Sequence, residues 1–228
     1  LDDGLHGDGV SGDGRFGAMV PAQPDHTIVE FFLTATDPQS LERTHPAVLA
    51  SGGRRTANLL YQVENSTYLG EQPIYRLIMT AAELDYLSTE VWGGQPYSDA
   101  MMNGTFVCTD GTVTGGTGPD VRQNCGFRNR GHGSRSTVPH NFHIAFPPDN
   151  PWRQRLGLNL NTHYTHSQQI GSAVFRLLGM PMPESRPVQV RVNASNLAKP
   201  GQEQFGAYAA NEVVDDNLGS FGGEQERV

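Results

Sequence analysis

Lysine is nearly absent from this sequence, in which Lys199 is the single example. Lysine and arginine together number 16, against 24 aspartates and glutamates, so the formal net charge at pH 7 is −8. A protein that binds nucleic acid through phosphate contacts needs a clustered basic surface. The composition therefore predicts no nucleic-acid partner.

Long apolar runs are also missing. Hydrophobic residues make up 36% of the chain, and the mean hydropathy is −0.46. No run approaches the roughly 20 apolar residues that a transmembrane helix needs, so we expect no membrane span. The sequence shows neither an initiator methionine nor a signal peptide, and we interpret it as an excised or processed part of a longer polypeptide. Its 27 glycines and 15 prolines are typical of a loop-rich and strand-rich extracellular protein.

Only two cysteines occur, and without a CxxC motif they do not support a cysteine-ligated zinc site or an attached haem. Cys108 and Cys125 lie on two predicted strands that flank a glycine-rich loop at 111–118. In an oxidising compartment a disulfide between them would close a short loop and contribute roughly 3 kcal/mol. Two buried thiols are the alternative interpretation.

The stretch from 155 to 193 is the best-specified unit of the sequence. Residues 156–161 alternate leucine with glycine or asparagine, and 188–192 alternate valine with polar residues, so each predicts a strand with one buried face. Between them, a helix is expected to end where Gly179 can adopt the left-handed conformation and Pro181 prevents the helix from resuming. The expected order is therefore strand, helix, strand.

Two helices have start signals in the sequence. Thr165 stands three residues before Gln168, and Thr80 stands three residues before Glu83. This is the spacing of a capping box, which satisfies the orphan amides at a helix start. The helix after Thr80 follows a predicted strand at 75–79. The helix after Thr165 has one apolar face, made of five residues at helical spacing: Ile170, Ala173, Val174, Leu177 and Leu178.

This arrangement resembles the CotH family of secreted and spore-coat proteins. The resemblance rests on the strand-helix-strand unit, on GFRNRGHGSRSTVPHNFHIAFP (126–147), on FGAYAANEVVDD (205–216) and on IYRLIMTAAELDYL (74–87), and it covers about residues 60 to 220. Several linked motifs in one order are stronger evidence than any one of them alone. The resemblance implies an α+β fold for residues 59–228: a mixed, mostly antiparallel sheet with a few helices, like the N-terminal lobe of a protein kinase.

The resemblance also suggests where a nucleotide would bind. In a kinase-like lobe a glycine-rich loop and a lysine hold the phosphates of Mg-ATP. The family tends to carry Lys-Lys at 140–141 and Arg-Glu-Lys at 170–172, whereas this sequence has His-Asn and Ile-Gly-Ser there. The family's catalytic acids lie in a second lobe beyond the end of this chain, so we assign no catalytic residue. Five residues could still present backbone amides and a guanidinium group to phosphates: Arg130, Gly131, Gly133, Ser134 and Arg135.

The first 46 residues have a character of their own. Four aspartates lie among six glycines near the start of the chain: Asp2, Asp3, Asp8 and Asp13. Calcium prefers several oxygen ligands on a backbone that turns sharply, so a Ca²⁺ site is one interpretation and a pair of Asp-Gly turns without an ion is the other. Residues 15–20 and 27–37 alternate like β-sandwich strands. Since the opening string resembles the Asp-Gly loops of bacterial immunoglobulin-like domains, we interpret 1–46 as the C-terminal part of such a domain and 47–58 as a linker.

Two functions are compatible with these features. The first is a non-catalytic structural or assembly module of a large secreted or cell-surface bacterial protein, in contact with other protein chains or with the remainder of its own polypeptide. The alternative is one part of a secreted ATP-dependent phosphotransferase whose catalytic lobe lies outside this chain. The missing lysines at 140–141 favour the structural module, because neutral side chains cannot replace a point charge that faces a triphosphate.

Overall fold

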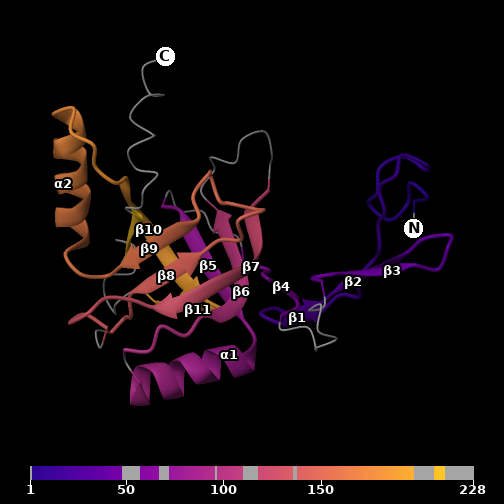
Figure 1. The fold of residues 1–228 in the computed structure, drawn as a ribbon, viewed down its shortest axis with the longest axis horizontal. Helices are drawn as coiled ribbons and strands as arrows, with labels where there is room; N and C mark the ends of the chain where they lie inside the picture. The colour runs from indigo at the N-terminus through magenta and orange to yellow at the C-terminus, as the bar shows by residue number, and fades with distance from the viewer. Residues whose placement is uncertain are drawn as a thin grey trace.

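The computed structural model describes residues 2–47, 57–66, 72–95, 97–109, 118–135, 138–197 and 208–213. Within them, a β-barrel carries helices on its outside and an extended N-terminal arm on one side (Figure 1). Strands make up more of the described chain than helices do.

Seven strands close into the barrel. Their order around the ring is β10-β12-β9-β8-β7-β6-β5, and β5 pairs with β10 to close it. Neighbouring strands are antiparallel except β5 and β10, which run parallel. The short strand β11 (Ser195–Asn196) pairs with the last two residues of β10. The seven barrel strands are β5 (Ile74–Met79), β6 (Met102–Thr109), β7 (Asp120–Asn129), β8 (Phe142–Ala145), β9 (Gly157–Asn161), β10 (Ser185–Val192) and β12 (Tyr208–Glu212).

The closed barrel corrects the fold class expected from the sequence. The expectation of an α+β fold with a kinase-like sheet is wrong, because the structure is mostly β and the sheet closes on itself. At the closing seam the Gln189 amide donates to the Pro73 carbonyl oxygen at 2.8 Å, and the Asn193 amide donates to that of Leu77 at 2.9 Å. Closure lets the inner faces of the strands cover one another and leaves the sheet without an open edge.

Aromatic side chains fill part of the barrel interior. Phe106 meets Tyr75, Phe146 and Trp152 edge-on, each with ring centroids 5.3 Å apart. All four rings are buried. Each such pair contributes about 0.5–1.5 kcal/mol beyond the apolar area that it buries. The barrel interior is therefore a packed core.

Helix α1 (Ala81–Tyr86) begins as the sequence predicted. Thr80 is its N-cap, and the Thr80 hydroxyl accepts a hydrogen bond from the Glu83 amide at 3.2 Å. The chain continues directly into a wider π-helical segment, η1 (Leu87–Gly94), whose buried leucine and valine join the barrel core. Thr80 is confirmed as the N-cap, whereas the return bond from the Glu83 side chain that would complete a capping box stays a prediction.

Helix α2 (Thr165–Leu177) is confirmed as a helix, but its start differs from the prediction. Its N-cap is Tyr164, which lies in the left-handed region at φ 50°, and no side chain caps it. The Gln168 side chain returns to the residue before the N-cap, where its Nε2 atom donates to the His163 carbonyl oxygen, and not to the N-cap amide as a capping box requires. Its Oε1 atom instead accepts hydrogen bonds from the side-chain amides of Asn161 at 2.9 Å and Asn211 at 2.6 Å. Contacts with the barrel strands therefore replace the local cap.

The end of α2 follows the prediction. Gly179 has φ +74°, in the left-handed region that favours glycine. Its amide donates to the Arg176 carbonyl oxygen, and the Met180 amide donates to that of Phe175, both at 3.0 Å. These are the two bonds of a Schellman motif, which satisfies the last carbonyl groups of a helix.

The N-terminal arm consists of two-stranded ribbons. Strand β1 (Ile28–Phe31) pairs with β4 (Leu59–Gln62), and β2 (Leu33–Thr36) pairs with β3 (Glu42–His45), both antiparallel. Residues 15–20 form no strand. The predicted stretch at 27–37 does form strands, β1 and β2, but they lie in separate two-stranded ribbons and the residues of β2 and β3 are largely exposed. The assignment of 1–46 to an immunoglobulin-like domain stays a prediction.

Strand β4 connects the arm to the barrel. The Thr105 hydroxyl donates to the Leu60 carbonyl oxygen at 2.8 Å, and the Leu60 amide donates to Oε1 of Gln123 at 3.1 Å. The predicted domain boundary assigns β4 to the second domain, at 59–228. In the structure β4 contacts both the arm and the barrel. Most of the predicted linker, residues 48–56, lies outside the described residues.

Candidate functional site

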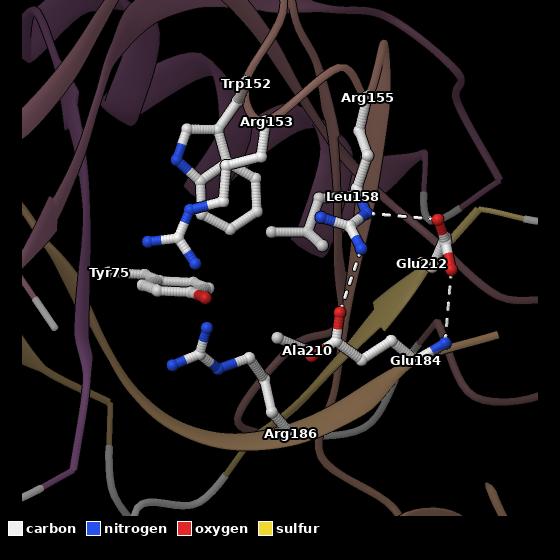
Figure 2. A pocket seen from close by; sticks show the side chains of 9 residues that line it. All are labelled: Tyr75, Trp152, Arg153, Arg155, Leu158, Glu184, Arg186, Ala210 and Glu212. Carbon is white, nitrogen blue, oxygen red and sulfur yellow. Dashed lines mark hydrogen bonds and ion pairs between the residues drawn. The ribbon is translucent and has the colours of Figure 1, made fainter. Parts of the chain in front are cut away.

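A small hollow, partly open to solvent, lies at one end of the barrel. It forms where β5, β9, β10 and β12 meet the loop between β8 and β9 (Figure 2). Three arginines, two glutamates and two aromatic residues dominate its lining. The nine lining residues are Tyr75, Trp152, Arg153, Arg155, Leu158, Glu184, Arg186, Ala210 and Glu212.

Arg155 lies at the centre of an ion-pair network in this hollow. Its Nε atom donates to Oε1 of Glu212 at 3.1 Å, and its Nη2 atom donates to Oε2 of Glu184 at 2.9 Å (Figure 2). The Glu184 amide donates to the other carboxylate oxygen of Glu212 at 3.2 Å. The network joins the segment before β9, the start of β10 and the end of β12. It therefore holds three chain segments together.

The other two arginines of the hollow lie beside aromatic rings. The guanidinium carbon of Arg153 is 4.6 Å from the centroid of the Trp152 ring, a cation–π geometry. In the view of Figure 2, the Tyr75 ring lies between the guanidinium groups of Arg153 and Arg186. The nine lining residues include no serine, threonine, cysteine or histidine. The lining thus offers no aliphatic hydroxyl, thiol or imidazole for acyl-transfer catalysis, and its one hydroxyl group is the phenol of Tyr75.

The loop predicted to hold a nucleotide is closed by its own side chains. Arg135 donates from Nε to the Gly131 carbonyl oxygen at 2.5 Å, from Nη1 to that of Ser98 at 3.0 Å, and from Nη2 to Oδ1 of Asp99 at 2.6 Å. The hydrogen bond from Arg135 and the charge of Arg128 lower the pKa of the Asp99 carboxyl. The guanidinium group that the nucleotide interpretation needs is therefore engaged within the chain.

The rest of this loop has the same character. Arg130 donates to Oδ1 of Asn161, and the side-chain amide of Asn141 donates to Oγ of Ser134 at 3.2 Å. Gly131 has φ +109°, and a Cβ atom there would lie 2.3 Å from Oγ of Ser134. Gly133 has open space around it. Nucleotide binding by these residues stays a prediction, and their observed contacts are those of a tight turn.

The N-terminal aspartates bind backbone amides. Asp2 accepts from the amides of Gly12 at 2.6 Å and Gly14 at 3.0 Å. Asp8 is buried and accepts from the amides of Asp3 at 2.6 Å and Gly4 at 3.1 Å. Burial by itself would raise the pKa of Asp8, but these amides outweigh it and the pKa is lowered. Each carboxylate thus stabilises a turn of the loop.

The remaining two aspartates of this loop also have local partners. Asp3 pairs with Nδ1 of His6 at 2.9 Å, and Asp13 accepts from the Arg15 amide at 2.9 Å. The loop therefore has the contacts of Asx turns, the second of the two sequence interpretations. Calcium binding stays a prediction.

A metal-ligand group that the sequence did not reveal lies at the base of the arm. Among the described residues, Asp25, His26 and Glu64 are the one group of three whose ligand atoms all lie within 4.8 Å of one another. The pairing of β1 with β4 brings them together across a separation that local motifs cannot show. Two guanidinium groups already face Glu64, that of Arg76 at 3.5 Å and that of Arg191 at 3.9 Å. Their charges compete with a cation there.

The predicted disulfide is contradicted by the strand register. Cys108 lies opposite Asp120, and Cys125 lies opposite Gly104. The two cysteines are thus offset by four residues along β6, or about 13 Å at roughly 3.3 Å per residue, whereas a disulfide needs Cα atoms within about 7 Å. Both are buried thiols. The alternative interpretation from the sequence, two buried thiols, describes the structure.

Helix α2 differs most from the prediction, because helical periodicity predicted that its apolar face packs against the core. The expected apolar residues of this helix do not enter the core; they face outward, and Ser172 is the buried residue of α2. Figure 1 shows α2 at the periphery, beside the barrel. Seven large apolar residues of this helix and the segment after it are 37% to 87% exposed, and we call them the α2 face: Ile170, Val174, Phe175, Leu177, Leu178, Met180 and Met182.

Comparisons with known proteins leave the family open. No protein-family model matches the chain, and no curated protein matches its sequence. Within the described residues, no helix has the length and apolar character needed to cross a membrane.

Proposed function

We propose that this chain is a non-catalytic structural and assembly module of a larger extracellular protein. The observation that carries the proposal is the position of Arg135, whose three hydrogen bonds all go to acceptors in the chain itself. Positioning groups and metal ions supply almost all the catalysis of phosphoryl transfer. Because Arg135 holds the turn of its own loop, we infer a structural role for this loop.

The hollow at the barrel end supports the same proposal. Arg155 donates hydrogen bonds to the carboxylates of Glu184 and Glu212 there. An ion pair of this kind fixes the ends of strands. The α2 face supports the assembly part of the proposal, because contiguous exposed apolar patches of more than a few hundred Å² mark interaction sites.

The extracellular setting and the CotH resemblance belong to the proposal as well. The first rests on the glycine-rich and proline-rich composition. The second rests on the order of the sequence motifs, and its kinase-like fold is not part of what we propose.

A thermal-shift titration with Mg-ATP tests the non-catalytic role. A ligand that binds only the folded state raises its stability by mass action, by about 2.7 kcal/mol when its concentration is 100 times Kd. We expect no change in the melting temperature of the purified chain. A saturable rise that persists in Arg15→Gln, a variant of the N-terminal arm, but disappears in Arg130→Gln would overturn the proposal in favour of a nucleotide-dependent function.

A further inference from the structure

The α2 face is a large apolar surface on the outside of the barrel. Its most exposed member, Leu177, is 87% exposed, and Leu178 and Ile170 are 69% and 64% exposed. A surface helix of a folded domain normally turns its apolar stripe toward the core. Here the stripe turns outward, so its burial must come from a contact outside the described fold.

The size of this face matches that of a stable interface. At roughly 200 Å² for a fully exposed large side chain, the exposed fractions of its seven residues correspond to about 800 Å². A standard protein–protein interface buries about 800 Å² on each partner. The α2 face is thus large enough to supply most of one partner's share of such an interface.

The charge on this face permits contact with an identical copy. Between 165 and 183, Arg176 is the single arginine, and lysine, aspartate and glutamate do not occur. The chain as a whole carries a formal charge of −8, so most other pairs of surfaces would bring acidic groups together. The α2 face is therefore a surface where two copies can meet with little repulsion.

The spacing of the apolar residues fits a two-fold arrangement. Ile170, Val174 and Leu178 follow one another at intervals of four, which forms a continuous ridge along a helix. Val174 is the midpoint of this ridge. A two-fold axis beside Val174 would place Ile170 of one copy opposite Leu178 of the other, and Val174 opposite its own equivalent. A two-fold contact of this kind uses the same patch on both copies.

We propose that two copies of this chain associate through antiparallel packing of their α2 faces about a two-fold axis beside Val174. The proposal rests on the proposed function as an assembly module and names the partner as a second copy of the chain. In the proposed dimer, neither the loop at 130–135 nor the hollow takes part in the contact.

Sedimentation velocity of the purified chain over a range of concentrations tests this proposal. We expect a dimer that dissociates on dilution. Val174→Glu and Val174→Arg should each weaken association by roughly tenfold or more, because each places like charges at the centre of a desolvated contact. An equimolar mixture of the two variants should recover the dimer, since opposite charges then meet across the axis.

Met19→Glu is the matched control, because Met19 is an exposed apolar residue of the arm and is 79% exposed. It should leave the dimer intact, and far-UV circular dichroism should be the same for all variants. A chain that is monomeric at every concentration, a dimer that survives Val174→Glu, or a mixture that fails to recover the dimer would each overturn the proposal. If the chain is monomeric and its melting temperature does not change with Mg-ATP, the proposed dimer is wrong and the proposed non-catalytic role stands. If the chain is a dimer that Mg-ATP stabilises, the proposed non-catalytic role is wrong and the proposed dimer stands.

Discussion

Arg155 and Glu212 form an ion pair at 3.1 Å between residues that are 57 positions apart in the chain. Their side chains are 22% and 16% exposed, so the pair is largely removed from water. It joins the loop before β9 to the end of β12 at one end of the barrel. We therefore expect this link to contribute to the stability of the barrel.

Replacing Arg155 by methionine tests this link. The variant keeps an unbranched apolar stem but leaves the Glu212 carboxylate in a partly buried place without its cation. We expect the free energy of unfolding in urea to fall by about 2 kcal/mol, below the value for a fully buried pair because some solvent screening remains. The accompanying change Glu212→Leu should restore part of the loss, since it removes the stranded charge.

Glu184→Gln is the control for this prediction. The Glu184 side chain is 44% exposed, so its ion pair with Arg155 should contribute less than about 1 kcal/mol. A larger loss for Glu184→Gln than for Arg155→Met would contradict the assignment of Glu212 as the principal partner.

Gly131→Ala should destabilise the turn that contains Arg135. Gly131 has φ +109°, and a Cβ atom would lie 2.3 Å from Oγ of Ser134, so an alanine needs both a strained backbone and a displaced neighbour. We expect the free energy of unfolding to fall by about 1–3 kcal/mol. Gly133→Ala, in the same loop but with nothing within 4 Å of the new atom, should change it by less than about 0.5 kcal/mol. Equal effects of the two substitutions in thermal unfolding would sink this account.

Local signals in the sequence were sufficient for individual elements. The alternation of 188–192 lies within β10, and the Thr80 cap and the Gly179 stop are as expected, because each depends on residues within one or two turns of the chain. The start of α2 departs from the pattern because Gln168 has partners on the barrel. A nearby strand competes with a local cap, and its position cannot be read from spacing.

The closure of the barrel depends on long-range pairing. The parallel contact of β5 with β10 joins residues more than a hundred positions apart, and alternation within each strand is the same in an open sheet and a closed one. The same limit applies to the α2 face. Helical periodicity identified its ridge, for example Ile170 and Val174, but a ridge has the same spacing whether it packs inside a domain or against another molecule.

The offset of Cys108 and Cys125 arises from strand register in the same way. Two cysteines on neighbouring strands fit a disulfide in one register and not in another, and the long loop between β6 and β7 leaves the register undetermined by sequence. The hollow was also inaccessible to sequence reasoning, because Arg155 and Glu212 have no motif that connects them.

His143 should make the stability of the barrel depend on pH. Burial is the main cause that lowers the pKa of His143 below its ordinary value of 6.5; the hydrogen bond with Asn159 opposes this, and the charges of Arg128 and Arg130 add to it. The unfolded chain therefore binds a proton at a higher pH than the folded chain. The stability that His143 contributes is fully present above pH 6.5 and is lost as the pH falls through the folded pKa.

The variant His143→Gln checks this prediction, since glutamine keeps a donor for Asn159 but does not titrate. Urea unfolding between pH 7.5 and pH 5 should show a smaller loss of stability for the variant than for the wild type as the pH falls. Some pH dependence should remain, because burial also lowers the pKa of His140. Parallel curves for wild type and variant would show that His143 is not responsible.

The two cysteines should behave as protected thiols. Burial raises the pKa of the Cys125 thiol to about 12, so the reactive thiolate is scarce at neutral pH. Cys108 is fully buried as well. In the folded protein, without reductant, a thiol reagent should modify neither residue at an appreciable rate, and in guanidinium chloride it should modify both. Mass spectrometry that finds no modification after unfolding would establish a disulfide and contradict the register of β6 and β7, whereas rapid modification of the folded chain would contradict the burial.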